Sequence, residues 1–207
     1  PNGKEGIDFL TSIFTITSAV SVTGLSVVDV SKTFSLFGKT VIMIVFQLGG
    51  LGIMTFSSLI MYLIGKKITY QEKRILQEDL NQEKVGGILH FMERLAIIVI
   101  TIEGLGAIFL FSVFKHDFET GTAIYYAIFH SISAFCNAGF SLFTNSFEIY
   151  SGNITINIVI SSLIILGGIG FAVINSSIYY LKTGISSFSL TSKVAVKISA
   201  WLLLIGT

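Results

Sequence analysis

Long apolar stretches without charge dominate this chain of 207 residues. The stretch 41–64 contains 24 uncharged residues, the stretch 154–181 contains 28, and the stretch 95–114 contains 20 residues interrupted only by Glu103. At about 1.5 Å of rise per residue, a helix over each stretch crosses a hydrocarbon core of about 30 Å. Charged residues are only 12% of the chain, whereas a soluble domain has about 25%. We therefore predict an all-α, polytopic integral membrane protein in contact with the lipid bilayer.

The composition excludes several classes of function. The formal net charge is +1, from 13 Lys and Arg against 12 Asp and Glu, so no large basic surface for nucleic acid is predicted. Cys136 is the single cysteine, and the three histidines are too widely spaced to form a metal motif. The glycine-rich segment 49–52 lies inside an apolar stretch and not between a strand and a helix. With no nucleophile–base pair either, we predict that the chain is not an enzyme.

Two further apolar stretches are poor candidates for helices that face lipid. Residues 11–23 include seven Ser or Thr in thirteen positions, and residues 131–140 are mostly small and end near a glycine. A helix of about 13 residues covers only about 20 Å. Irregular backbone after such a helix is tolerated at membrane depth only where it is buried in protein or lines water. We therefore predict that both stretches are re-entrant, with a short helix followed by a loop that turns back.

The distribution of basic residues favours the same arrangement, because Lys and Arg accumulate in short cytoplasmic loops. The loop 65–94 holds six of them and is predicted to lie inside. If 120–147 folds back instead of crossing, the segment 115–153 lies outside with one basic residue, and the three lysines after residue 181 lie inside. Nine of the 13 basic residues are then cytoplasmic.

The chain also contains an internal repeat. An offset of 115 residues aligns 6–26 with 121–141 with seven identities in 21 positions, and an offset of 118 aligns 48–52 with 166–170. Two crossings per unit leave successive units in the same orientation, so the repeats are parallel. The predicted boundaries are 1–65 for a first repeat without its leading helix, 66–87 for a cytosolic loop, 88–182 for a second repeat and 183–207 for the start of a third.

Parallel repeats that each send a loop inward from the same side surround one axis when there are four of them. A dehydrating cation needs oxygen ligands, and backbone carbonyls supply them without a formal charge. Pointing successive carbonyls at an axis requires backbone angles that glycine adopts most readily, and each loop has one, at Gly24 and Gly139. The pattern favours pore architecture like that of a potassium channel. Because the chain starts at Pro1 and stops within an apolar stretch, we expect a fragment of a four-repeat protein.

Four motifs resemble those of a known family: SVTGL at 21–25, QLGGLGIMTF at 47–56, GKK at 65–67 and FHSISAFCNAGFS at 129–141. In order and spacing the chain resembles the membrane subunits of the Trk/Ktr/HKT potassium-transporter superfamily, most of all the bacterial Ktr branch. The resemblance implies K+ uptake, with Na+ open as a second ion, by a homodimer in the cytoplasmic membrane. It also implies gating by a cytosolic ring of nucleotide-binding regulatory subunits, which alone would bind nucleotide. The implied K+ ligands are the filter carbonyls of Val22, Thr23, Gly24, Asn137, Ala138 and Gly139.

Three polar side chains have two interpretations each. Glu103 lies in the middle of a spanning helix, where a charge costs at least about 2.5 kcal/mol. It either carries the proton of a coupled cation or solute symporter or, as we favour, supports the filter from behind, being protonated or hydrogen-bonded to a donor on a pore helix or loop. His130 lies within the second pore helix, where a buried filter-supporting imidazole is favoured over a ligand. Cys136 is expected to be an inert residue at the outer pore mouth.

The glycines at 49–52 and 167–170 also have two interpretations. They form either a gating hinge or, as we favour, sites where neighbouring backbones approach closely. A third class of function is a non-conducting membrane anchor for a cytosolic complex. Reconstituted full-length protein without K+ flux would favour that class.

Overall fold

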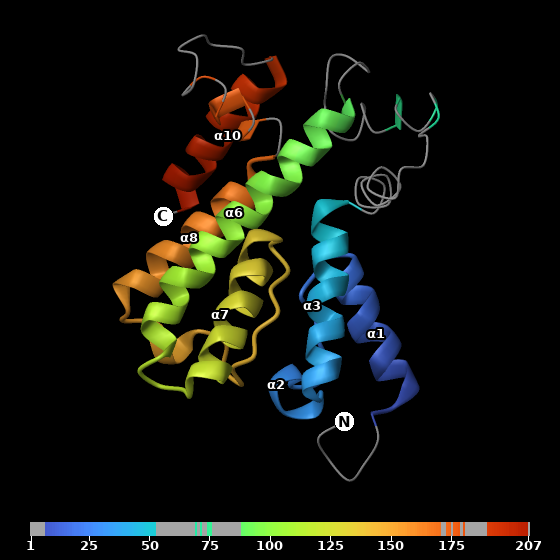
Figure 1. Ribbon diagram of the computed structural model, residues 1–207, viewed down its shortest axis with the longest axis vertical. Coiled ribbons are helices and arrows are strands. Elements are labelled where there is room, and N and C mark those ends of the chain that lie inside the picture. Colours follow the sequence, from blue (N-terminus) through green and yellow to red (C-terminus); the bar gives the residue numbers. More distant parts are fainter. Residues whose placement is uncertain are drawn as a thin grey trace. The chain divides into compact units, whose positions relative to one another are not determined.

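The computed structural model describes residues 7–52, 69, 71, 74–75, 88–170, 173–174, 176–178, 180 and 190–206. This described part is helical and has no strand, which confirms the predicted all-α class. Nearly all of the predicted cytosolic loop 66–87 lies outside it. The elements are α1 (Phe9–Val20), α2 (Val30–Thr33), α3 (Leu36–Leu51), α6 (Ile88–Phe114), α7 (Thr120–Phe135), the 3-10 helix η1 (Glu148–Tyr150), α8 (Ile154–Gly168) and α10 (Leu190–Gly206) (Figure 1).

The chain divides into two compact units. The first consists of residues 1–53 and 100–165, and the second consists of residues 54–99 and 166–207. All six predicted filter residues belong to the first unit, as do α1, α2, α3 and α7. The candidate site is therefore built entirely within the first unit.

Helix α6 is the one helix in the described part that is long and apolar enough to cross a membrane. Its segment Glu93–Phe114 has 22 residues and a mean hydropathy of 2.4, whereas α1, α3 and α8 are apolar but shorter. The sequence predicts unbroken helices over 41–64 and 154–181, and this is wrong. Gly52 ends α3 with a φ of 82°, and Gly170, with a φ of 93°, follows the end of α8. A positive φ stops a right-handed helix, and glycine adopts it without a steric cost.

Helices α1 and α7 are each followed by chain that turns back. With 12 and 16 residues they are about 18 and 24 Å long, shorter than a hydrocarbon core of about 30 Å. Neither has a basic residue in its last turn, and each ends in a tight turn, at Ser21 and at Cys136. Figure 1 shows the chain after α7 running back beside that helix.

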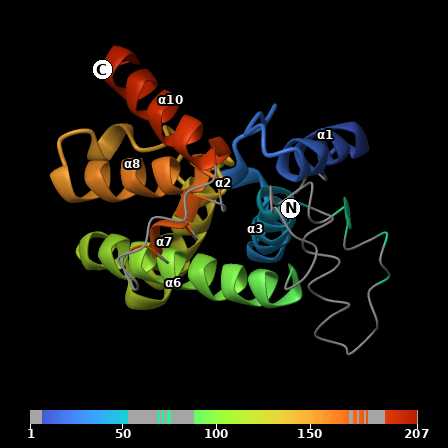
Figure 2. The same cartoon turned by 90° about the horizontal axis from the view of Figure 1, so that it is seen from above.

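Glycine allows α3 to approach both short helices closely. Helix α3 lies beside α1 and also contacts α7 (Figures 1 and 2). A Cβ atom at Gly49 would clash with the carbonyl group of Val20, and one at Gly50 would lie 2.7 Å from Sγ of Cys136. In lipid, helix association depends on such close packing more than on the hydrophobic effect. Gly49 and Gly50 therefore serve packing, whereas Gly52 ends the helix.

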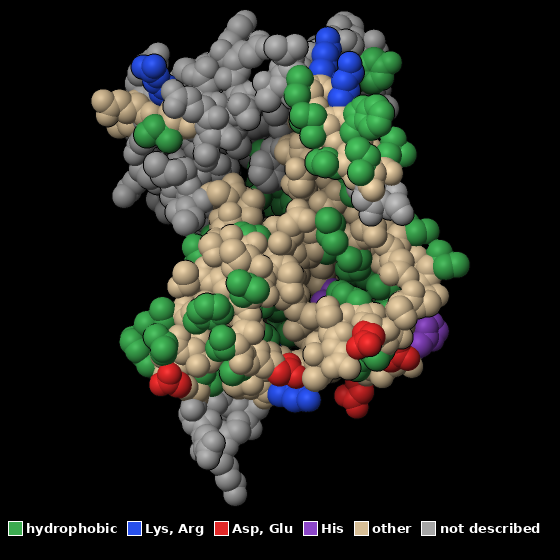
Figure 3. All heavy atoms as spheres, turned by 180° about the vertical axis from the view of Figure 1, so that it is seen from behind, with side chains coloured by type: hydrophobic (Ala, Val, Ile, Leu, Met, Phe, Trp, Pro, Cys, Tyr) green, Lys and Arg blue, Asp and Glu red, His purple; other side chains and the backbone are tan. Residues whose placement is uncertain are grey.

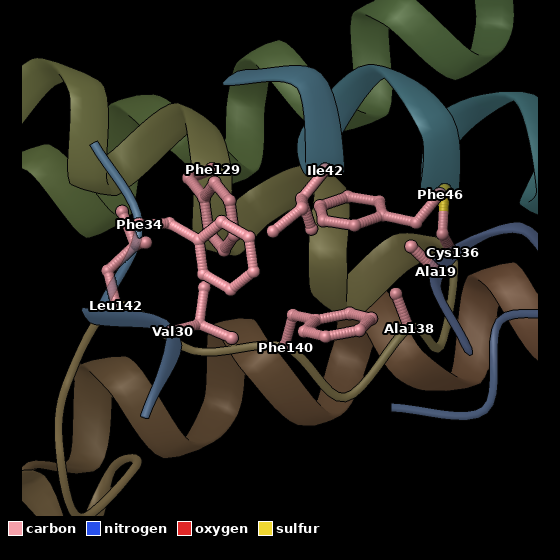
Figure 4. Packing of buried hydrophobic residues seen from close by; sticks show 10 residues of the cluster. All are labelled: Ala19, Val30, Phe34, Ile42, Phe46, Phe129, Cys136, Ala138, Phe140 and Leu142. Atoms are coloured by element: carbon pink, nitrogen blue, oxygen red, sulfur yellow. The ribbon is translucent and has the colours of Figure 1, made fainter. Parts of the chain in front are cut away.

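One aromatic core joins the two halves of the first unit (Figure 4). Phe46 of α3 lies at its centre, fully buried. Its ring meets Phe129 of α7 edge-on at 5.4 Å between centroids and stacks on Phe140 at 6.0 Å. The other buried members of this core are Ala19, Val30, Phe34, Ile42, Cys136, Ala138 and Leu142.

The surface of the helices is typical of a membrane protein. Ile108 on α6 is 64% exposed and Phe37 on α3 is 79% exposed, together with many other large apolar side chains. In Figure 3, carboxylate side chains gather at one end of the face shown, and apolar side chains form separate patches on the rest of the described surface. An exposed apolar surface of this extent requires a nonpolar environment or a protein partner.

Candidate ion-binding site

The segments after α1 and α7 have the same backbone conformation at equivalent positions of the repeat. We call Val22–Gly24 the first loop and Asn137–Gly139 the second loop. Val22 has a φ of 55° and Asn137 a φ of 57°, while Gly24 and Gly139 have φ values of 74° and 70°. Positive φ is uncommon for residues other than glycine, above all for a β-branched one such as valine. Its occurrence at both positions shows that the two loops share one backbone geometry.

Hydrogen bonds from the two loops to the preceding helices also match. The amide of Thr23 donates to the carbonyl of Ser18 at 3.0 Å, and the amide of Ala138 donates to the carbonyl of Ser133 at 2.8 Å. Both bonds span five residues and tie the middle of each loop to the last turn of its helix. The carbonyls that end each helix thus lie beside the loop that follows.

The two loops meet at their glycines. A Cβ atom built on Gly24 would lie 2.6 Å from the carbonyl oxygen of Ala138 and 3.0 Å from Cα of Gly139. A Cβ atom on Gly139 would lie 3.3 Å from Cα of Gly24. The backbones therefore approach each other where a side chain has no room.

The six predicted filter residues differ in exposure. Thr23, Asn137 and Gly139 are exposed, Val22 and Gly24 are half-buried, and Ala138 is fully buried. The Asn137 side chain donates through Nδ2 to the carbonyl of Ile164 on α8 at 3.3 Å. Within the described residues, no group of three or more His, Cys, Asp or Glu is placed to hold a metal ion.

His130 holds the chain that leaves the second loop against α7. Its Nδ1 lies 2.7 Å from the carbonyl oxygen of Tyr126, so Nδ1 carries the proton and donates it. Its Nε2 then accepts from the amide of Leu142 at 3.1 Å and from the hydroxyl of Ser141 at 3.2 Å. With both nitrogens engaged and 1% exposure, the imidazole is a buried, hydrogen-bonded group and not a free ligand.

Glu103 is buried on α6, and its partners differ from those predicted. Its carboxylate oxygens accept from Nε2 of Gln47 at 2.8 and 3.1 Å. This donor lies on α3, and not on α1, α7 or either loop, so the predicted kind of donor is wrong. Helix α7 contacts the backbone instead, because Ser131 Oγ donates to the Glu103 carbonyl at 2.6 Å. Analysis of the sequence missed Gln47, although an amide within an uncharged apolar stretch is itself a signal.

Cys136 does not lie at an exposed pore mouth, contrary to the prediction. It caps the C-terminal end of α7, is 9% exposed, and packs against Gly50 of α3. Its Sγ donates to Oε1 of Gln47 at 3.0 Å. The position is buried because the C-terminal end of α7 packs within the aromatic core, of which Cys136 is a member.

Comparison with known proteins identifies the class. The TrkH family, described as "Cation transport protein", matches residues 3–206 of the chain. The chain therefore belongs to the TrkH family of cation transport proteins, and this family consists of transporters and not of enzymes.

Named relatives narrow the comparison. The chain is 43% identical over 168 residues to "Ktr system potassium uptake protein B" of Bacillus subtilis (strain 168), covering 81% of this chain and 38% of that protein. It is 34% identical over 203 residues to the protein of the same name from Vibrio alginolyticus, covering 98% and 45%. It is 37% identical over 202 residues to "Potassium/sodium uptake protein NtpJ" of Enterococcus hirae, covering 98% and 44%. The chain thus spans less than half the length of these relatives.

Proposed function

We propose that this chain supplies two of the four repeats of a potassium uptake protein, and that K+ passes along the backbone carbonyls of the first and second loops. The observation that carries the proposal is the contact between Gly24 and Gly139. Two loops with matching positive φ values meet at their glycines, as expected for loops that share one axis. Two further repeats, from a longer polypeptide, would complete the ring around it.

The chemistry of this arrangement suits a monovalent cation. A ladder of carbonyl oxygens replaces the hydration shell and binds the ion weakly enough for it to leave again. Helices α1 and α7 end at Val20 and Phe135, just before the loops, so their C-terminal dipoles present partial negative charge there. In this proposal α1 and α7 are re-entrant pore helices, and α3 and α8 are the inner helices of their repeats.

His130 and Glu103 support the filter in this proposal without binding the ion. The hydrogen bonds of His130 to Ser141 and Leu142 fix the course of the chain after the second loop. Ser131 joins α7 to the backbone of Glu103 and so fixes the pore helix against α6. A filter discriminates ions only while its oxygens keep their spacing, so these contacts bear on selectivity.

The names of the relatives support the choice of ion and partners. Two of them are called potassium uptake proteins of a Ktr system, which supports K+ as substrate and a multi-subunit assembly. A third is called a potassium/sodium uptake protein, which supports Na+ as an additional ion. We extend this to a homodimer in the cytoplasmic membrane, crossing it several times and gated by a cytosolic nucleotide-binding ring. The nucleotide would act only through that ring.

Replacing Gly139 by Ser in the full-length protein tests the proposal. The new side chain meets Gly24 and the strained φ of the second loop, so we expect the K+ concentration for half-maximal uptake to rise by about tenfold or more. Uptake would be measured in cells that lack other K+ uptake systems. Gly152→Ser is the matched control, because a Cβ atom there meets nothing within 4 Å. Unchanged K+ affinity and selectivity in Gly139→Ser would remove the loops from the ion path.

A second candidate is a coupled symporter in which Glu103 carries the driving proton. A carboxyl group buried in a membrane helix favours it. In that case Glu103→Gln abolishes uptake while Gly139→Ser has no effect on ion affinity. In the pore proposal, Gly139→Ser impairs ion affinity, while Glu103→Gln leaves uptake largely intact.

A further inference from the structure

A chain of three side chains connects α6, α3 and the base of the second loop. Nε2 of Gln47 donates to both carboxylate oxygens of Glu103, at 2.8 and 3.1 Å. Oε1 of the same amide accepts from the thiol of Cys136 at 3.0 Å. The donor and acceptor ends of one amide are thus used at once, each toward a different helix.

Small residues bring the three helices close enough for this chain to form. Gly50, one turn beyond Gln47 on α3, has no room for a Cβ atom because Cys136 occupies that space. Gly106, one turn beyond Glu103 on α6, likewise faces Oγ of Ser131 on α7. The amide of Gln47 therefore lies in a tightly packed junction. Burying the Glu103 carboxylate there without this hydrogen-bond partner would be costly.

We propose that Gln47 is a positioning residue for ion selection: by bridging Glu103 and Cys136, its amide fixes the start of the second loop relative to the inner helix of the first repeat. Cys136 immediately precedes Asn137, the first residue of the second loop, so its position sets that of the loop carbonyls. This inference rests on the proposed function, since it assigns Gln47 to the same ion path.

The junction occurs once in the described part of the chain. At the offsets of the repeat, the position of Gln47 corresponds to Ile165 and that of Cys136 to Ser21. Ser21 donates instead to the carbonyl of Thr17 in its own helix at 2.8 Å. The bridge is therefore absent from the equivalent positions, Ile165 and Ser21. It lies where the two repeats meet.

A reciprocal exchange of the amide and the carboxylate tests the role. Gln47→Glu places two carboxylates together, and we expect the K+ concentration for half-maximal uptake, or the K+ over Na+ preference, to worsen by about tenfold or more. Glu103→Gln keeps a donor and an acceptor in contact and should stay within about threefold of wild type. The double variant Gln47→Glu/Glu103→Gln restores the pairing with its direction reversed, and should return to within about threefold of wild type.

The measurements use the full-length protein in liposomes, with uptake normalised to the amount of inserted protein. Ser112→Ala is the control on α6, because its hydroxyl is exposed and donates to the carbonyl of Phe109 in its own helix. If Gln47→Glu changes abundance or maximal rate alone, with affinity and preference intact, the bridge is merely structural and the inference fails. It also fails if the double variant does not recover.

If Gln47→Glu does not fold, Cys136→Ala provides a second test of the inference. It removes only the thiol end of the bridge, and we expect a shift in the same direction of about threefold. Unchanged affinity and preference in Cys136→Ala would overturn the inference. Failure of the proposed function looks different, because wild-type liposomes would then show no K+ flux, or Gly139→Ser would leave ion affinity unchanged.

Discussion

The two loops share a backbone but differ in what holds them. In the first loop, Thr23 Oγ1 lies 2.9 Å from Oγ of Ser18 and also donates to the Ser18 carbonyl at 3.3 Å. These are short-range bonds within one segment. Around the second loop, Ser133 Oγ donates to the carbonyl of Phe140 at 2.7 Å, and His130 bonds the next two residues. The same conformation is thus maintained by local hydroxyl bonds in one repeat and by a buried network in the other.

Aromatic packing also differs between the surroundings of the two loops. The ring of His130 stacks on Phe143 at 4.7 Å between centroids and meets Phe147 edge-on at 4.9 Å. Its equivalent in the first repeat is Thr15, which only donates to the carbonyl of Thr11 in its own helix. The comparison teaches that the two segments share φ values and main-chain bonds, while the side chains that support them differ.

The largest expected effect is a difference in K+ uptake between the alanine variants of Gly24 and Gly139. Both adopt positive φ, so alanine at either position costs about 1 to 2 kcal/mol of backbone strain. In Gly24→Ala the new Cβ atom also lies 2.6 Å from the backbone oxygen of Ala138, whereas in Gly139→Ala the nearest atom is 3.3 Å away. We expect Gly24→Ala to abolish K+ uptake and Gly139→Ala to retain a reduced rate.

Uptake per inserted molecule, measured side by side for the two variants, checks this order. Equal losses, or a greater loss in Gly139→Ala, would show that the close approach of the loops does not govern their tolerance.

The next effect compares His130 with Thr15. His130→Leu leaves the amide of Leu142 buried without its acceptor, and we expect a loss of about 3 kcal/mol in the free energy of unfolding. Thr15→Val removes one hydroxyl that serves only its own helix, and its expected cost is below about 1 kcal/mol.

Thermal unfolding in detergent, together with hydrogen exchange over residues 139–143, measures both. The exchange should accelerate in His130→Leu alone. If it stays protected in that variant, the network around His130 does not hold the second loop.

The sequence predicted what the two loops share, but not the difference in the side chains that support them. The identities that reveal the repeat, such as Gly24 with Gly139 and Ser18 with Ser133, specify backbone geometry, and they predicted where the loops lie. The hydropathy of 95–114 likewise predicted the long helix α6. These features are local in the sequence, so they can be recognised without knowing which segments contact each other in the fold.

Contacts between distant segments were not predictable in the same way. The bond between Gln47 and Glu103 joins residues 56 positions apart, and no spacing in one sequence indicates which apolar helix faces which. The helix ends at Gly52 and Gly170 were missed for another reason. Hydropathy continues through both glycines, while the positive φ that ends each helix leaves no trace in an apolar pattern.

The smallest expected effect concerns pH, and it is confined to the chain after the first loop. Asp29 caps α2, accepting from the amide of Ser31 at 2.8 Å and from its hydroxyl at 2.5 Å. Burial acts to raise the pKa of Asp29, but the hydrogen bonds with Ser31, the side chain of Thr144 and the nearby Lys32 together outweigh it, so the pKa is lowered. The equivalent position in the second repeat is Thr144, which does not titrate.

A lowered folded-state pKa means that ionised Asp29 stabilises the fold above the ordinary pKa of an aspartate, and that this contribution is lost as pH falls through the folded-state value. Asp29→Asn keeps a capping side chain and removes the titration. We expect the stability of wild type to exceed that of Asp29→Asn by less than about 1 kcal/mol at pH 7, with the difference shrinking as pH falls below about 4. Thr144→Ala should lose part of the same pH-dependent stability, because the side chain of Thr144 also helps to lower the pKa of Asp29. Unfolding temperatures of the three proteins between pH 7 and pH 3 measure this. A difference for Asp29→Asn that grows as pH falls would mean that the ionised carboxylate destabilises the cap of α2 instead of stabilising it.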